Sequence, residues 1–196
     1  FDERSWLYSM SALLPTDIKV RSISLAAKDF HPILASKAKV YRYRLWLGPC
    51  LNPFLQNQVL SIPYNAKVGL IEEGIKIFEG SHDFSSFCAK DADVKSKERT
   101  IFQVYVERSG PLVNLWFLGS GFLKQMLRII VGTLIDLSLS RYTLDEVRQM
   151  LTEKDRAKAG QTAAPSGLTL VEIFYDKTLS IEEIIKLGSD GYSIRL

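Results

Sequence analysis

The sequence has 196 residues, of which 46% are hydrophobic and 24% charged, and its formal net charge is +3. This composition excludes an intrinsically disordered chain and predicts a globular protein of one or two domains, and the charge alone indicates no partner. The two cysteines, Cys50 and Cys88, are too few and too far apart for a zinc pattern, which favours a reduced, cytoplasmic chain.

The first predicted element is a helix. Apolar side chains recur at helical spacing from Trp6 to Leu14, and Pro15 ends the pattern. Because the chain then begins at or inside a helix, we expect that residues upstream of Phe1 have been lost. The first residues lack the basic and apolar order of a signal peptide. Residues 18–25 predict a strand.

The stretch from Val40 to Leu47 predicts a strand that alternates strictly. One face carries Tyr41, Tyr43, Leu45 and Leu47, and the other carries Arg42, Arg44 and Trp46. We expect the first face to line a core or a pocket and the second to be basic. Tyr41 is then either a core tyrosine whose hydroxyl finds a partner, or a platform on which a nucleobase stacks.

Further elements follow without a regular alternation of strand and helix. They are a helix over 68–78 that Gly80 ends, a hairpin of strands over 101–108 and 112–118, a helix capped by Thr143 and Glu146, a strand over 168–175, and a last helix capped by Ser180 and Glu183 and closed by Gly188. This order predicts an α+β fold with a mostly antiparallel mixed sheet flanked by helices.

A single arginine, Arg128, interrupts the apolar helical run from Gly121 to Leu137. The run is apolar nearly all round, which predicts a central helix with one polar ridge of Lys124, Arg128, Gly132 and Asp136. A buried guanidinium needs a carboxylate or a phosphate to offset desolvation. The alternative is an arginine that reaches the surface along its aliphatic stem. Periodicity leaves both open.

Three groups of cations suit a polyanion such as nucleic acid, although each group is also compatible with ordinary solvated side chains. They are Lys37, Lys39, Arg42 and Arg44; Lys90, Lys95, Lys97 and Arg99; and Lys154, Arg156 and Lys158. No nucleophile accompanies His31 or His82, and phosphate-loop and zinc-hydrolase motifs are absent. Charges within the longest apolar stretch make it a poor membrane span. We expect no metal, no cofactor and no membrane partner.

Several stretches, taken in their order along the chain, carry a resemblance. They are Leu13–Val20, Phe30–His31 followed by Ala38–Trp46, Phe78–Phe87, Arg99–Ile101, Gly119–Leu134, and Asp155–Gly160 leading to Ala164–Glu172. Together they resemble the TruA family of tRNA pseudouridine synthases. The resemblance extends from Leu13 to Asp176 and leaves the residues after Asp176 unexplained.

The resemblance implies a pseudouridine synthase fold and a cofactor-free isomerase of the cytoplasm. Such an enzyme converts uridine to pseudouridine in the anticodon stem-loop of tRNA, at positions 38, 39 or 40, after flipping the base. It also implies a homodimer. Arg128 matches the arginine that pairs with the catalytic aspartate, and Tyr41 matches the tyrosine that packs on the uracil. Candidate RNA contacts are Arg42, Arg44, Lys37, Lys39 and His31.

The sequence departs from the family in two places. The catalytic aspartate lies in an Arg-Thr-Asp-Ala-Gly motif that this chain lacks, and Ile33 stands where an arginine is common. No other aspartate lies in the required motif, so the chain is predicted to be inactive by itself. Residues 1–58 are interpreted as a remnant of the N-terminal half with its connecting strand, 59–176 as the C-terminal catalytic half, and 177–196 as a tail. The alternatives are a catalytically silent RNA-binding module and a scaffold that binds no RNA.

Overall fold

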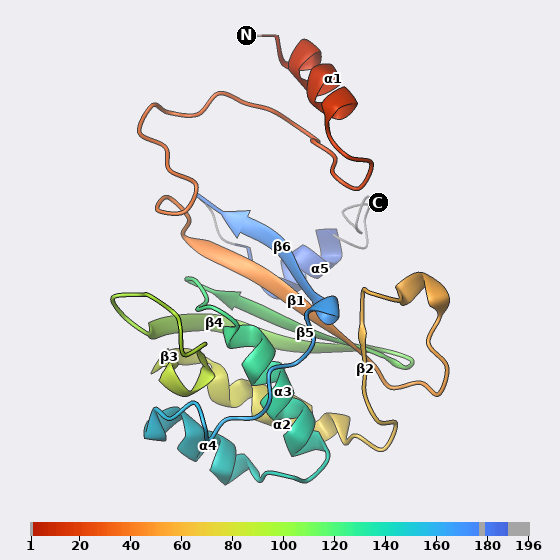
Figure 1. Ribbon diagram of the computed structural model, residues 1–196, viewed down its shortest axis with the longest axis vertical. Coiled ribbons are helices and arrows are strands. Elements are labelled where there is room, and N and C mark those ends of the chain that lie inside the picture. Colours follow the sequence, from red (N-terminus) through yellow and green to blue (C-terminus); the bar gives the residue numbers. More distant parts are fainter. Residues whose placement is uncertain (1, 177–178, 188–196) are drawn as a thin grey trace. The chain divides into compact units, whose positions relative to one another are not determined.

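The computed structural model describes residues 2–176 and 179–187, and the ribbon is drawn in Figure 1. The chain divides into two compact units, Phe1–Ala35 and Ser36–Leu196, which are described separately. The second unit combines helices with one six-stranded sheet, which confirms the predicted α+β class. Gly188, the predicted end of the last helix, lies outside the described residues.

The first unit contains one helix, α1 (Glu3–Leu13). Asp2 caps it by accepting a hydrogen bond from the Arg4 amide at 3.1 Å, and Pro15 follows its end, so the predicted first helix is confirmed. The predicted strand over 18–25 is wrong, because the structure has no strand there. A strand requires a ladder of backbone hydrogen bonds, and no described strand pairs with this segment.

The second unit is built on a sheet of order β2-β1-β5-β4-β3, with β6 also paired to β1. The strands are β1 (Ala38–Trp46), β2 (Leu60–Ser61), β3 (Gly80–Asp83), β4 (Glu98–Ser109), β5 (Leu112–Gly119) and β6 (Leu168–Phe174). Every pairing except β1 with β2 is antiparallel. The four strands predicted in this unit are confirmed, with slightly different ends.

Helices lie on both faces of this sheet (Figure 1). They are α2 (Val68–Ile75), continued by a 3-10 turn to Phe78, α3 (Met126–Ser138), α4 (Leu144–Glu153) and α5 (Ile181–Leu187). Further 3-10 turns span Pro53–Leu55, Ser85–Phe87 and Pro165–Gly167. Both predicted caps are confirmed: Thr143 and Glu146 exchange hydrogen bonds, as do Ser180 and Glu183.

The alternation of β1 separates two apolar clusters. Tyr43 and Leu45 pack with α2, α3 and α4 on one face, whereas Ala38 and Val40 pack with Ile181 of α5 on the other. All of these side chains are fully buried. Each large apolar side chain removed from water contributes about 1.5–3 kcal/mol, so α3 is held firmly against the Tyr43 face.

Helix α3 begins later than the apolar run suggests. Gln125 has φ of +61°, a left-handed conformation that a continuous helix does not allow, and α3 starts at the next residue. Lys124 therefore precedes the helix, where its ammonium pairs with the Asp91 carboxylate at 2.6 Å. The predicted ridge of Lys124, Arg128, Gly132 and Asp136 is wrong at its first member.

Candidate active site

A cavity of about 210 Å³ opens where β1, β6 and the start of α3 meet. Its walls include Tyr41, Phe122, Leu123, Gln125, Arg128 and Leu168. Tyr41 comes from the middle of β1, and Leu168 is the first residue of β6. The structure thus brings the two residues singled out in the sequence, Tyr41 and Arg128, into one cavity, which aromatic, aliphatic and polar side chains line.

Arg128 is half-buried in the wall of this cavity. Its Nε–H donates a hydrogen bond to the Ala163 carbonyl at 2.7 Å, and the Ala163 amide donates to the Arg128 carbonyl at 3.0 Å. Among the described residues no carboxylate forms an ion pair with Arg128 or lies in the cavity wall. The two terminal nitrogens of the guanidinium are therefore left for an anion.

The reciprocal pair with Arg128 belongs to a longer contact between α3 and residues 159–164, here called the strap. A Cβ at Gly132 would collide with the Gln161 carbonyl oxygen, so only glycine allows the strap this close to the helix. The Gly160 amide donates to Thr133 Oγ1 at 3.0 Å. The strap follows α3 and fixes the carbonyl that orients Arg128.

Arg156 and Tyr43 hold the two ends of the strap. The Arg156 guanidinium donates to the Ala159 and Gly160 carbonyls and to Thr162 Oγ1, at 3.1–3.3 Å. The Tyr43 hydroxyl donates to the Ala164 carbonyl at 2.5 Å. Burial raises the pKa of Tyr43 to about 12, although the positive charge of Arg128 opposes that rise. Tyr43 therefore remains a hydrogen-bond donor over the physiological pH range.

Tyr41 is half-buried, and its ring lies edge-on to Phe122, with centroids 5.2 Å apart and an interplanar angle of 83°. Burial raises the pKa of its hydroxyl. Its ring contributes to the cavity wall, where a flat aromatic ligand could pack on it. This arrangement accommodates the nucleobase platform considered from the sequence, which stays a prediction.

The candidate RNA contacts do not gather around this cavity. Arg42 and Arg44 point to the opposite face of β1: Arg42 lies over the Trp116 ring at 5.2 Å, and Arg44 is 91% buried and donates to Gln58 at 2.9 Å. Lys39 follows the alternation of Tyr41, and Lys37 is exposed just before β1. Their contacts with RNA stay predictions.

His31 belongs to the first unit, where its Nδ1 accepts hydrogen bonds from the Ile33 and Leu34 amides at 3.2 and 3.3 Å. These contacts close a local turn. A role of His31 toward RNA stays a prediction as well.

The cavity residues that were not selected from the sequence include Phe122, Gln125 and Leu168. All three fall within stretches that resemble the family, but apolar periodicity alone assigns Phe122 and Leu168 to the core. The left-handed turn at Gln125, which creates the opening, has no signature such as Gly or Asn.

Two features are absent from the described residues. No three histidine, cysteine or acidic side chains in this part of the chain gather in a way that would hold a metal ion. No helix within the same residues is long and apolar enough to cross a membrane.

Comparison with known proteins gives a consistent set of relatives. A sequence profile of the family described as "tRNA pseudouridine synthase" matches residues 75–176. The protein named tRNA pseudouridine synthase A of Geobacillus kaustophilus is 33% identical over 92% of this chain and 70% of its own length. The proteins of that name from Anoxybacillus flavithermus and Bacillus subtilis are 38% and 37% identical, over 89% and 87% of this chain and 70% and 69% of their own lengths.

Proposed function

This chain belongs to the tRNA pseudouridine synthase family, and from that membership we propose that its Tyr41 and Arg128 cavity is the uridine site of such an isomerase. The observation that carries the proposal is Arg128. Its half-buried guanidinium lines this cavity, one nitrogen is bonded to the Ala163 carbonyl, and no described carboxylate occupies the cavity wall. The site is arranged to receive an anion.

The anion is the carboxylate of the family's catalytic aspartate. With Nε bound to Ala163, the two terminal nitrogens of Arg128 can form a bidentate pair with that carboxylate. Partial burial strengthens such a pair, and the positive charge of Arg128 keeps the carboxylate ionised against the cost of that burial. Arg128 is thus proposed to hold the aspartate in place beside the ribose of the target uridine.

Tyr41 is proposed to pack on the flipped uracil. Flipping costs a few kcal/mol, and stacking on an aromatic ring returns about 1–3 kcal/mol per base. During the isomerisation the bond between C1′ and N1 breaks, the uracil rotates, and a bond forms between C1′ and C5. The C5 hydrogen leaves as a proton and N1 takes up a proton, so that the product is an isomer of uridine. Phe122, Leu123 and Leu168 in the same wall have side chains without hydrogen-bonding groups that would hold the detached base in one orientation.

We further propose that this chain alone does not isomerise uridine, because its sequence contains no Arg-Thr-Asp-Ala-Gly motif. Three aspartates that the sequence does contain, Asp83, Asp136 and Asp155, have local partners instead. Asp83 accepts from Ser85 and pairs with Lys154 at 2.9 Å, Asp136 pairs with Arg141 at 2.7 Å, and Asp155 accepts from the Ala157 amide at 2.9 Å.

The finer assignments are part of the same proposal. The target uridines are at positions 38, 39 or 40 of the anticodon stem-loop, and the active form is a cytoplasmic homodimer. Residues 1–58 and 59–176 correspond to parts of the two halves of the enzyme, and 177–196 to a tail. Lys39 is the best placed of the predicted RNA contacts, since it follows the alternation of Tyr41.

A catalytically silent RNA-binding module is the second candidate. It is favoured by the hydrogen bond between Arg128 and Ala163, which already gives the guanidinium a structural role. The two candidate functions are distinguished with a version of the chain that is extended upstream through an Arg-Thr-Asp-Ala-Gly motif. The enzyme forms pseudouridine at positions 38–40 of a tRNA transcript, whereas a module binds the transcript and leaves every uridine unchanged.

A further inference from the structure

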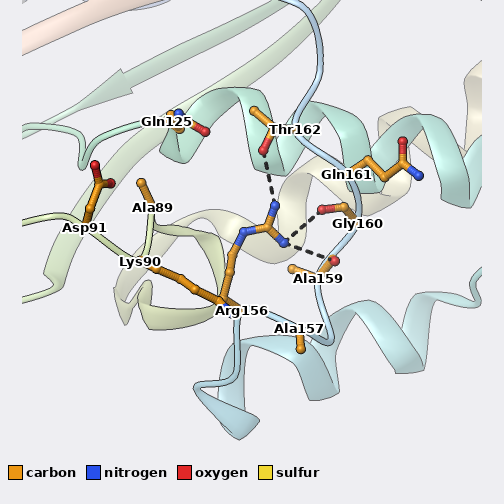
Figure 2. A pocket seen from close by; sticks show the side chains of 10 residues that line it. All are labelled: Ala89, Lys90, Asp91, Gln125, Arg156, Ala157, Ala159, Gly160, Gln161 and Thr162. Carbon is orange, nitrogen blue, oxygen red and sulfur yellow. Dashed lines mark hydrogen bonds between the residues drawn. The ribbon is translucent and has the colours of Figure 1, made fainter.

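A second and larger cavity, of about 490 Å³, lies beside the first and shares Gln125 with it. Its walls include Lys90, Asp91, Gln125, Arg156, Gln161 and Thr162, and it is called the Arg156 cavity below. Figure 2 shows Arg156 with its guanidinium turned toward the strap and Gln125 at the start of α3. The two cavities thus adjoin at Gln125.

The wall of the Arg156 cavity is positively charged. Lys90 is exposed and has no ion-pair partner among the described residues, while the one carboxylate, Asp91, is already paired with Lys124 at 2.6 Å. That pairing lowers the pKa of Asp91 and keeps its charge compensated. Two cations, Lys90 and Arg156, therefore remain without a carboxylate.

Arg156 has hydrogen-bond donors that are not used within the described residues. Its Nη1 donates to the Ala159 and Gly160 carbonyls and its Nη2 to Thr162 Oγ1, which accounts for three of its five N–H groups. Its Nε–H and the second Nη2–H have no acceptor within the described part of the chain. An anion in the cavity would accept from them.

The polar side chain of Gln125 belongs to the walls of both cavities. Its φ of +61° is uncommon for a residue other than glycine, and its exposed side chain makes no capping bond to α3. As the N-cap position of a 13-residue helix, it also lies at the positive end of the helix dipole. Because its exposed side chain lines both cavities, Gln125 can contact a ligand that extends from one cavity to the other.

We propose that the Arg156 cavity binds a backbone phosphate of a nucleotide adjacent to the flipped uridine. The inference rests on the proposed function, because the uridine in the Tyr41 cavity sets which nucleotides reach the second one. Lys90 and Arg156 supply charge and donors to the phosphate oxygens, and the Gln125 amide contacts the same linkage. Phosphate contacts of this kind fix the register of a nucleic acid without reading its sequence.

Binding of a labelled anticodon stem-loop RNA to the chain itself tests the proposal without requiring turnover. Lys90→Ala should weaken binding about five- to tenfold and lower the slope of log affinity against log salt by about one phosphate contact. The matched control is Lys76→Ala, an exposed lysine outside both cavities, which should bind as the wild type does. Equal affinities of the two variants would overturn the proposal.

Gln125→Gly separates binding from folding. Glycine tolerates φ of +61°, so the variant should unfold at the same or a higher denaturant concentration than the wild type. It should nevertheless bind the stem-loop several-fold more weakly. If it is stable and binds normally, Gln125 has only a structural role and that part of the proposal is wrong.

Stem-loops with single neutral methylphosphonate linkages locate the phosphate. Lys90→Ala should lose its effect when the neutral linkage lies next to positions 38–40, and keep it for linkages elsewhere. Coupling at a distant linkage would contradict the proposal. If the wild type binds no stem-loop even at low salt, the proposed function fails first, which is a distinct result.

Discussion

The two faces of strand β1 differ in how completely their polar groups are paired. On the face toward α3, the Tyr43 hydroxyl is bonded to Ala164 and Arg128 to Ala163. On the opposite face, buried Arg42 Nε, Arg44 Nε and Trp46 Nε1 have no hydrogen-bond partner in the described structure. An unpaired buried polar atom costs about 1–3 kcal/mol, so the first face has the features of a preorganised site and the second does not.

Strand alternation therefore places neighbouring polar side chains in two different environments, but it does not decide which of them lines a cavity. Tyr41 and Arg42 are neighbours in sequence, yet only Tyr41 reaches the cavity at the start of α3. The cations of the other face are held among Trp116, Glu107 and Gln58, where burial lowers the pKa of Arg42 and of Arg44.

The largest expected effect is on catalytic activity, and it distinguishes the two faces of β1. In a version of the chain extended through the aspartate motif, Arg128→Ala should lower kcat by about 10²–10³, because it removes the charge that holds the aspartate. Arg44→Ala, on the other face, should change kcat of the folded enzyme by less than about threefold. Single-turnover pseudouridine formation measures both. Equal losses for the two variants would remove the distinction between the faces.

The next largest effect is expected on the free energy of unfolding at alkaline pH, which depends on Tyr43. Below pH 10 the tyrosine is protonated in both states, so its contribution is complete. Between pH 10 and its native pKa of about 12 only the unfolded state ionises, which costs the native state about 2–3 kcal/mol.

The free energy of unfolding of the wild type should therefore fall toward that of Tyr43→Phe over this range. Urea unfolding at pH 8, 10 and 12 measures the difference. Tyr8→Phe, at a position that is 80% exposed, is the control and should stay parallel to the wild type. A constant difference between the wild type and Tyr43→Phe would show that burial does not raise the pKa of the Tyr43 hydroxyl.

Gly132→Ala should destabilise the protein by about 1–3 kcal/mol, because its Cβ collides with the Gln161 carbonyl and forces the strap away from α3. The matched control is Gly69→Ala in α2, where a Cβ meets nothing within 4 Å and better helix propensity should stabilise slightly. Thermal unfolding of both variants measures the contrast. Similar behaviour of the two would mean that the strap yields at little cost.

The smallest effect is expected on the second face. Arg44→Met replaces a guanidinium with an unpaired buried Nε by an apolar side chain of similar length, and should change the free energy of unfolding by less than about 1 kcal/mol. Denaturant unfolding measures it. A loss of several kcal/mol would indicate that the Arg44 bond to Gln58 is worth more than its geometry suggests.

Local patterns predicted much of the fold. The alternation of β1, the β4 and β5 hairpin and the capping pair of Thr143 and Glu146 are all local, and the structure contains them. The strand over 18–25 failed because a strand also requires a partner, which composition does not reveal. The two-residue β2 is too short to leave a pattern.

The candidate site was predictable only in part. Arg128 was conspicuous as a charge in an apolar run, and resemblance selected Tyr41. What orients Arg128 is the strap, whose close approach depends on Gly132 and Gln161 meeting across 29 positions of sequence. Such contacts are set by tertiary packing, and neither periodicity nor charge pattern indicates them.

The most direct test of the account is tritium release from tRNA that carries 5-tritiated uridine, since pseudouridine formation frees the hydrogen at C5. We predict no release by this chain and release by the version extended upstream through an Arg-Thr-Asp-Ala-Gly motif, which Arg128→Ala then slows by about 10²–10³. Release by the chain as it stands would mean that another of its carboxylates performs the chemistry, and would contradict the role assigned to Arg128.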